Sequence, residues 1–436
     1  MLDEFCDIYT FEESVIKYNK NQHNLYILSK EFDQIKPKGI LLTRLSIFDD
    51  IERGTIKNDK EKVSEILKIL MSSENPQAKS LLISKLNISD KEKRSIGSML
   101  GMVIGDAMGA INEFKSVRYD KKDTFSMGAG GNFYLKPGQW TDDTSMGICL
   151  ADSLLMNKGE LNQHDLMKRF IAWWKGGYNN AFRFCIENEK KYPRGSVGLG
   201  GNISLSLSLY IKEYRTTGNP SPETKAGNKN TSGNGSIMRN AAVPICFNKD
   251  INKACEVAKR QSLVTHQGVE AKECCSLLTN IIVQILNGEK LEKIFENLEK
   301  RFKSDVKSVE KLAKHEQEGY DENRNWNWKV PQYYYSPQRS KKMPGYIGSY
   351  CMDAMAMSLN IVYTTNNFRD AIIKSVNLRG DSDSVSSVVG QIVGAYYPLE
   401  EIPGEWIREV FKWDHGEIAL RGYMLARLKE GKSYII

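Results

Sequence analysis

Residues 97–110 read GSMLGMVIGDAMGA, and residues 383–397 read DSVSSVVGQIVGAYY. Both stretches are apolar runs of helical length, and glycine- and Ser/Thr-rich loops separate them from further runs of this kind, such as residues 269–288. The alternation of apolar and polar residues that is typical of β-strands is scarce. The sequence therefore predicts an all-α fold in which the functional groups lie on the loops between helices.

A change in composition near residue 92 predicts two units in this chain of 436 residues. Residues 1–92 are rich in Lys, Asp and Ile, whereas glycine becomes frequent after this point. Single cores rarely exceed roughly 250 to 300 residues. We therefore expect a small helical N-terminal extension over residues 1–92, with a role in recognising a partner protein, and a compact helical domain over residues 93–436. The apolar residues of segment 41–48 must be buried within the extension, against the larger domain or on a partner.

The composition argues against several classes of protein. The net charge of +7 comes from scattered lysines, often mixed with glutamates as in residues 290–316. No nucleic-acid-binding signature accompanies them, so we expect solvated helix faces and no nucleic-acid surface, although a weak attraction to an anionic ligand such as pyrophosphate is compatible with this charge.

Cysteine usage and hydropathy point to an ordinary intracellular protein. The eight cysteines form no CxxC pair, and several lie in apolar runs, which predicts buried free thiols without a zinc site. Residues 1–14 are acidic and lack a leader pattern, and no stretch holds about 18 uninterrupted apolar residues. We expect a cytoplasmic protein without a membrane span. Residues 321–344, which are aromatic, basic and irregular, are predicted to form a long surface loop.

Three short acidic loops, each next to an apolar helix, carry the groups best suited to chemistry. Their residues are Glu113 in the first loop, Thr141, Asp142 and Asp143 in the second, and Asp381, Asp383 and Ser384 in the third. Carboxylate and hydroxyl oxygens are the ligands that hard divalent cations prefer. The alternative is helix N-capping, which contributes about 1 kcal/mol at each position. Three acidic clusters that are each flanked by glycine exceed what capping requires.

A glycine-rich segment is the second candidate. Its residues are Thr231, Ser232, Gly233, Asn234, Gly235 and Ser236. Glycines let backbone N–H groups approach a ligand closely, and Ser, Thr and Asn can donate to a phosphate or a ribose. A flexible loop that leads into a helix explains the same pattern. His266 is one of only five histidines, and such a residue before a helix is more often a cap or a surface residue than a catalytic one.

Five motifs, in order, resemble the ADP-ribosylglycohydrolase family over roughly residues 95–400. They are GMVIGDAMGAINEF (101–114), WTDDTSM (140–146), GNGSIMRNAAVPI (233–245), THQGVEA (265–271) and LRGDSDSVSSVVGQIVGAYYP (378–398). The resemblance implies an all-helical catalytic domain with two Mg²⁺ ions, or Mn²⁺ in their place, at the mouth of a cleft. It also implies that Glu113 is a mobile glutamate near the metals, and that the loop 231–236 and His266 hold ADP-ribose. The implied metal ligands are Thr141, Asp142, Asp143, Asp381, Asp383 and Ser384.

The resemblance further implies a metal-dependent hydrolase that removes ADP-ribose from modified protein side chains. The serine version of the last motif and residues 345–368 are similar to the branch of the family that acts on arginine, although Arg379 stands where many members have glycine. The bond breaks through an oxocarbenium-like centre, and Asp142, Asp143 or Glu113 is the expected proton acceptor. The alternative is a binding protein whose N-terminal extension blocks an ADP-ribosyltransferase, with or without hydrolase activity. Intact acidic motifs argue against a scaffold alone.

Overall fold

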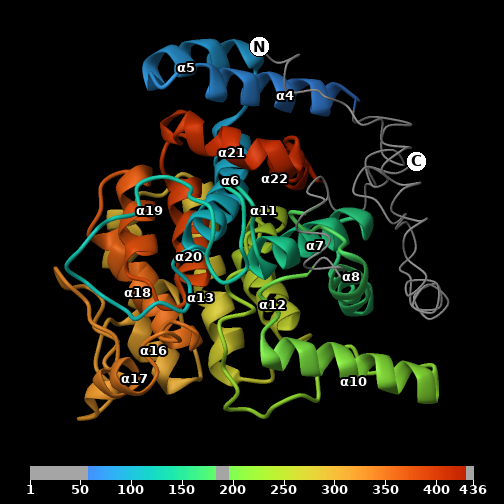
Figure 1. Ribbon diagram of the computed structural model, residues 1–436, viewed down its shortest axis with the longest axis vertical. Helices are drawn as coiled ribbons and strands as arrows, with labels where there is room; N and C mark the ends of the chain where they lie inside the picture. Colours follow the sequence, from blue (N-terminus) through green and yellow to red (C-terminus); the bar gives the residue numbers. More distant parts are fainter. Residues whose placement is uncertain (1–56, 183–195, 429–436) are drawn as a thin grey trace.

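The computed structural model describes residues 57–182 and 196–428, which fold almost entirely into helices (Figure 1). Segment 41–48, Cys6 and Cys185 lie outside the described residues. The helices are α4 (Lys57–Ser72), α5 (Pro76–Ile83), α6 (Asp90–Gly109), α7 (Asp142–Met156), α8 (Gln163–Gly176), α10 (Gly201–Thr217), α11 (Ala242–Cys246), α12 (Ile251–Ser262), α13 (Val269–Leu286), α14 (Leu291–Glu296), α15 (Leu298–Arg301), α16 (Lys307–Ala313), α17 (Pro337–Lys342), α18 (Cys351–Tyr363), α19 (Phe368–Asn377), α20 (Ser382–Tyr396), α21 (Gly404–Asp414) and α22 (Glu417–Arg427).

Short 3-10 turns and isolated bridges complete the described secondary structure. The turns are η2 (Ser84–Leu86), η3 (Glu322–Arg324) and η4 (Leu399–Glu401). Within residues 57–182 and 196–428 there is no strand, only isolated β-bridges such as the one between Gly233 and Tyr350. The predicted all-α fold is therefore confirmed.

Helices α6 and α20 form the central pair of the fold and pack backbone against backbone (Figure 1). Every fourth residue of α6 from Gly97 to Gly109 is a glycine, and these glycines face residues spaced in the same way on α20. A Cβ atom on Gly101 would overlap the carbonyl oxygen of Gly390, and one on Gly390 would overlap that of Gly101. Only residues with no side chain, or a small one, allow such an approach. The close packing places the C-terminal end of α6, at Gly109, beside the N-terminal end of α20, at Ser382.

Replacing Gly101 by alanine is expected to lower the free energy of unfolding by about 2 kcal/mol, because the added methyl group forces two backbones apart. The better helix propensity of alanine offsets only about 1 kcal/mol of the strain. Urea denaturation measures the effect. The matched control is Gly201→Ala in α10, where a Cβ meets no atom within 4 Å. Equal losses in the two variants would contradict the proposed role of the close contact.

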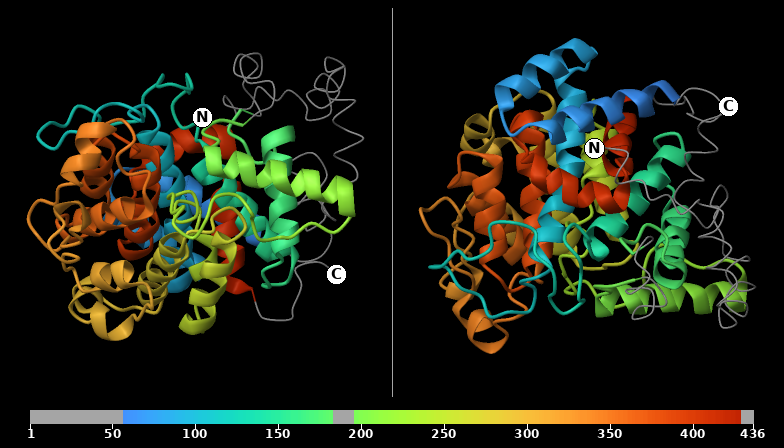
Figure 2. Two further views of the ribbon diagram at one scale, coloured as in Figure 1. Left: turned by 90° about the horizontal axis from the view of Figure 1, so that it is seen from below. Right: turned by 45° about the horizontal axis from the view of Figure 1, so that its top comes forward.

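The remaining helices surround this pair. Helix α22 packs along α6, while α13, α18 and α19 pack along α20. Helix α7 contacts α6, α11 and α22, and α8 and α10 follow it at the periphery, as the views in Figure 2 also show. The segments that connect to α7 and α20 therefore meet near the centre of the molecule.

The described part of the predicted N-terminal extension lies across the C-terminal helices. Helix α4 contacts α21 and α22, and α5 contacts η4 (Figure 1). Val63 and Ile66 of α4 are buried, and the Lys79 ammonium donates to the carbonyl oxygens of Glu400 (3.2 Å) and Ile402 (3.3 Å). The expected boundary near residue 92 falls in the first turn of α6, which begins at Asp90. The division into residues 1–92 and 93–436 stays a prediction.

The segment 321–344 differs from its predicted form. Trp326 and Trp328 are fully buried, so the segment is not simply a surface loop. The Trp328 indole donates to the carbonyl of Leu312 (2.8 Å), and the Asn360 amide donates to the carbonyl of Trp328 (2.8 Å). These two bonds satisfy the Trp328 indole and carbonyl groups and hold this part of the irregular backbone beside α16 and α18.

Two smaller predictions concern thiols and membranes. All described cysteines are free, and Cys149, Cys274, Cys275 and Cys351 are buried, as predicted. Over residues 57–182 and 196–428, no helix has the length and apolar character needed to cross a bilayer.

Candidate functional site

Five acidic side chains from separate segments converge near the ends of α6 and α20. The carboxylates of Asp106, Asp143 and Asp383 form one group, and those of Glu113, Asp381 and Asp383 form a second. In each group the ligand atoms lie within 4.8 Å of one another. We call these five residues the acidic centre. Asp383 belongs to both groups, so two sets of side chains that could each hold a metal ion share one carboxylate.

The loop before α20 and the turn after α6 are tied together. The backbone N–H of Phe114 donates to the carbonyl of Gly380 (2.9 Å), and that of Gly380 donates to the carbonyl of Lys115 (2.9 Å). These bonds hold Glu113 beside Asp381. Arg379 adopts a φ of 64°, a conformation that suits glycine, so the arginine at this position is accommodated with some backbone strain.

Asp106 is a residue that the motif analysis missed. Its carboxylate accepts hydrogen bonds from the backbone N–H groups of Thr141 (2.9 Å) and Thr144 (2.9 Å) and from the Thr141 hydroxyl (2.8 Å). The Thr141 oxygen also lies 3.1 Å from Asp143 Oδ2 and 3.4 Å from Asp383 Oδ2. Asp106 therefore positions the start of α7. The signal in the sequence was that it is the one acidic residue in the glycine-rich run 97–110.

Burial raises the pKa of every carboxyl group in the acidic centre, and repulsion between carboxylates raises the pKa of Glu113, Asp143 and Asp383 further. Burial is the first cause for Asp143 and Asp383, and neighbouring carboxylates raise both pKa values further. For Glu113, burial comes first and the charges of Asp383 and Asp381 follow. Among the described residues, no lysine or arginine is among the main influences on these five groups. Within residues 57–182 and 196–428, no basic side chain therefore compensates the charge of the cluster.

Two buried oxygens of the acidic centre have no hydrogen-bond donor. Asp143 Oδ1 and Glu113 Oε2 are both without a partner among the described residues. Buried polar atoms normally find a partner, and divalent cations take carboxylate oxygens as ligands. The residues present therefore fit a metal centre.

The capping alternative fails for the residues at the helix starts. Thr141 is the N-cap of α7 and Asp381 is the N-cap of α20, and neither side chain makes a capping hydrogen bond to its helix. The Thr141 hydroxyl contacts Asp143, and Asp381 accepts from Asn234 as well as from Ser384 in the first turn of α20. A role in capping therefore does not explain why these residues are acidic or hydroxylated.

Asp142 and Ser384, the other two predicted ligands, are placed differently. Asp142 belongs to neither group of carboxylates, and a Cβ on Gly198 would overlap its Oδ1 atom. Asp142 thus faces the 196–201 segment while Asp143 faces Asp383, as adjacent residues at the start of a helix point in different directions. The Ser384 hydroxyl lies 3.5 Å from Met238 Sδ, and it also hydrogen-bonds to Asp381.

The glycine-rich loop lies directly against the acidic centre. The Asn234 amide donates to Asp381 Oδ2 (3.0 Å) and to the carbonyl of Gly348 (3.0 Å). Ser232 Oγ is buried and has no partner among the described residues, whereas Ser236 Oγ accepts from Ser262 (2.8 Å) in the core. Thr231 is partly exposed and accepts from the N–H of Asn228 (3.0 Å). Of the predicted binding residues, Ser232 and Asn234 are the best placed to face a ligand.

His266 lies beneath this loop and is neither a cap nor a surface residue. It is buried, and its Nδ1 atom is 2.8 Å from the Thr265 hydroxyl. A Cβ on Gly233 or Gly235 would press against its ring, at 3.3 Å and 2.9 Å. Burial, and then the charge of Arg239, lower the pKa of His266 to about 3. The imidazole is therefore neutral and supports the glycine-rich loop from below.

Comparisons with known proteins agree with this geometry. A profile described as ADP-ribosylglycohydrolase matches residues 87–432. The ADP-ribosylarginine hydrolase Tri1 of Serratia proteamaculans (strain 568) is 30% identical over 327 residues, which cover 75% of this chain and 76% of that protein. Tri1 of Pseudomonas putida (strain GB-1) is 29% identical over 73% of this chain and 74% of its own length. A solved structure described as an ADP-ribosylglycohydrolase-related protein complex matches with a TM-score of 0.57 and 26% identity, covering 78% of this chain and 100% of that one.

Proposed function

Since this chain belongs to the ADP-ribosylglycohydrolase family and is a hydrolase of ADP-ribose glycosidic bonds, we propose that it releases ADP-ribose from modified arginine side chains of proteins. The observation that carries the proposal is the acidic centre, which contains four of the residues that the family resemblance implies and lies within the matched region. Arginine is proposed as the acceptor because two relatives bear the name ADP-ribosylarginine hydrolase. The substrate would be an ADP-ribosylated protein or ADP-ribosyl-arginine, and residues 1–92 would help to select the modified protein.

The acidic centre is proposed to hold two divalent cations, Mg²⁺ or Mn²⁺. Thr141, Asp143 and Asp383 would hold one, and Glu113, Asp381 and Asp383 would hold the other. All of these ligands are oxygens, which such cations prefer. When bound, the cations supply positive charge that orients the ribose hydroxyls and lowers the pKa of water.

The chain's own residues would orient the substrate and move protons. Asn234 belongs to the glycine-rich loop and donates to Asp381 and to the carbonyl of Gly348. It would therefore fix the position of this loop, which is proposed to bind the ribose, relative to the acidic centre. The unpartnered Ser232 hydroxyl could donate to a phosphate or a ribose oxygen. His266 is neutral and covered by the loop, so its role would be to hold Gly233 and Gly235 in place.

Glu113 is the preferred candidate for proton transfer. Its side chain is 9% exposed, whereas Asp143 is 1% exposed and already accepts a hydrogen bond from Thr141. Glu113 also lies in a turn and not in a helix, and one of its oxygens has no partner among the described residues. Asp142 lies outside both groups of carboxylates. The alternative role, in which the chain only blocks an ADP-ribosyltransferase, is not favoured, because relatives that cover most of the chain are named as hydrolases.

A panel of defined substrates tests the proposed function. We expect the full chain with Mg²⁺ to release ADP-ribose from arginine-linked peptides faster than from serine-linked peptides or poly-ADP-ribose, as measured by mass spectrometry. EDTA should stop release, and added Mg²⁺ or Mn²⁺ should restore it. Preferential release from serine would overturn the arginine assignment. Full turnover in excess EDTA would overturn the metal assignment.

A further inference from the structure

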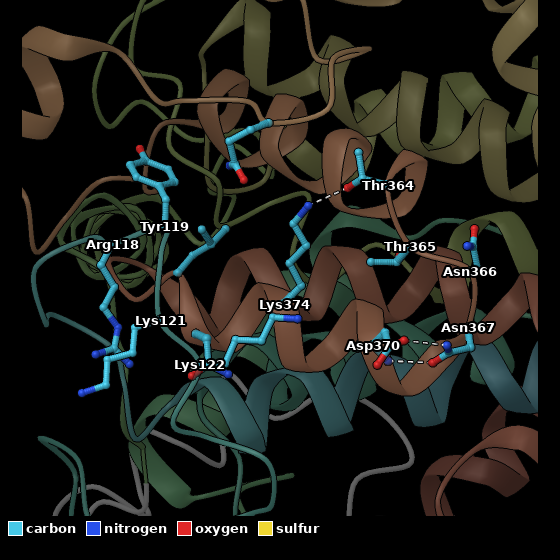
Figure 3. A pocket seen from close by; sticks show the side chains of 13 residues that line it. Arg118, Tyr119, Lys121, Lys122, Thr364, Thr365, Asn366, Asn367, Asp370 and Lys374 are labelled. Carbon is cyan, nitrogen blue, oxygen red and sulfur yellow. Dashed lines mark hydrogen bonds between the residues drawn. The ribbon is translucent and has the colours of Figure 1, made fainter.

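A cavity lies beside the loop that leads to the acidic centre, and none of the carboxylates of that centre lines it. Its volume is about 460 Å³, within the range of about 300 to 1,000 Å³ that is typical of small-molecule sites. Figure 3 shows the side chains that line it, which come from the segment 118–122, from the turn between α18 and α19, and from α19. Leu378, at its wall, precedes Asp381 by three residues. The cavity is thus adjacent to the proposed active site and separate from it.

One end of this cavity carries excess positive charge. Lys121, Lys122 and Lys374 line it, and none of the three forms an ion pair within the described part of the chain. Lys374 is half-buried, and its ammonium donates to the Thr364 hydroxyl (2.6 Å), which is neutral. Burial, and then the charge of Lys122, lower the pKa of Lys374. An anion bound between these lysines would stabilise their charged forms and so oppose the lowering of the Lys374 pKa.

The acidic residues nearby do not cancel this charge. Asp123 is paired with Arg118 (2.5 Å) and lies 3.5 Å from Arg379, and the charge of Lys121 also lowers its pKa, so it offsets part of the charge of Lys121 but none attributed to Lys122 or Lys374. Asp370 is the one carboxylate among the lining residues, and it accepts from the Asn367 amide (2.8 Å). In Figure 3, Asp370 lies at the far end of the cavity from Arg118 and Lys121. The cavity therefore has a cationic end and a neutral, polar end.

The polar end suits a ligand with hydroxyl groups. Thr365 and Asn366 line it (Figure 3); the Thr365 hydroxyl donates to the carbonyl of Ile361 (2.7 Å), so its oxygen remains an acceptor, and the Asn366 amide offers both a donor and an acceptor. Such groups donate to and accept from sugar hydroxyls. An apolar or aromatic ligand would find few partners there.

Hydrogen bonds to the main chain hold the wall of the cavity in place. The Asn377 amide oxygen accepts from the N–H groups of Asp123 (2.7 Å) and Thr124 (2.9 Å), and the N–H of Arg118 donates to the carbonyl of Leu378 (3.0 Å). These bonds hold the segment that carries Lys121 and Lys122 against α19. A ligand would therefore meet a site whose main chain is already ordered, which lowers the entropic cost of binding.

We propose that this cavity binds a phosphorylated sugar or a nucleotide, with the phosphate between Lys122 and Lys374 and the sugar hydroxyls toward Thr365 and Asn366. Ammonium groups bind phosphate as point charges, and a dianion matches the excess charge of the lysines. The proposal goes beyond the hydrolysis of ADP-ribose and does not depend on it.

Calorimetric titration of the full chain in EDTA with ribose 5-phosphate tests the proposal. We expect binding of one molecule per chain, no binding of unphosphorylated ribose, and weaker binding at high salt. Lys122→Met and Lys374→Met should each weaken binding by about tenfold or more, and Lys85→Met, a matched control at an exposed site on η2, should not change it. Lys122 is exposed, so its variant tests the site even if Lys374→Met unfolds the protein.

A parallel titration with AMP distinguishes the two sources of phosphate. Tighter binding of AMP than of ribose 5-phosphate would assign a nucleotide, and equal or weaker binding would assign a sugar phosphate. The lysine variants are expected to hydrolyse ADP-ribosyl-arginine within about twofold of the parent, since neither lysine belongs to the acidic centre. Absence of binding by both probes would overturn the proposal. Binding that Asp383→Asn abolishes and both lysine variants leave intact would also overturn it, because the probe would then occupy the acidic centre.

Discussion

Asp383→Asn is expected to reduce kcat/KM for ADP-ribosyl-arginine by at least about 10³-fold, equivalent to about 4 kcal/mol of transition-state stabilisation. The physical reason is that Asp383 is the one carboxylate common to both groups of the acidic centre. Asparagine keeps the shape of the side chain but removes its charge, so both proposed cation sites are weakened at once. Steady-state kinetics at several Mg²⁺ concentrations measure the loss. Asp305→Asn, at an exposed site, is the matched control and should be neutral.

Thermal denaturation separates a lost metal site from a damaged fold. A cation that binds only the folded state raises its stability by mass action, so Mg²⁺ should raise the melting temperature of the parent and not that of Asp383→Asn. In EDTA the variant should be at least as stable as the parent, because it relieves repulsion among buried carboxylates. Reduced activity together with an unchanged response to Mg²⁺ would contradict the assignment of Asp383 as a shared ligand.

A pH series in EDTA examines the same charge cluster. Because the pKa of Asp383 is raised in the folded state from its ordinary value of 3.8, the folded protein retains a proton that the unfolded chain releases above that pH. The unfolded state therefore binds fewer protons, and the stability of the metal-free protein falls as pH rises from 3.8 toward the raised value. Saturating Mg²⁺ should flatten this dependence.

Glu113→Gln is expected to lower kcat by about 10² to 10⁴-fold, the usual contribution of a positioned acid or base. Glutamine preserves the size of the side chain and its contacts near Asp381, but it cannot accept a proton at neutral pH. Single-turnover kinetics with ADP-ribosyl-arginine measure the chemical step directly. Glu296→Gln, on the exposed face of α14, provides the matched control.

The Mg²⁺ dependence of Glu113→Gln distinguishes its two proposed roles. If Glu113 transfers a proton, activity should stay low at saturating Mg²⁺, because no added cation replaces the base. If Glu113 only ligates a cation, excess Mg²⁺ should restore most of the turnover. Full rescue would therefore move the proton-transfer role to Asp143 or to another group.

The motifs alone identified much of the acidic centre. Thr141, Asp143, Asp381 and Glu113 were predicted because short acidic loops flanked by glycine are visible in the linear sequence, and the structure brings them together. The helical secondary structure could also be predicted, since apolar residues recur with helical spacing in stretches such as 97–110. These features are local, so neighbouring residues are sufficient to reveal them.

Tertiary structure alone decided which side chains face one another. Asp106 is 35 residues from Thr141 in the chain, and it meets Thr141 only because α7 packs against α6 in the fold. The burial of Trp328 depends on bonds to Leu312 and Asn360 from distant segments. In the same way, Lys122 and Lys374 read as solvated lysines in the sequence and line one cavity in the fold. Spacing along the chain determines which face of a helix a residue occupies, whereas long-range packing determines what that face meets.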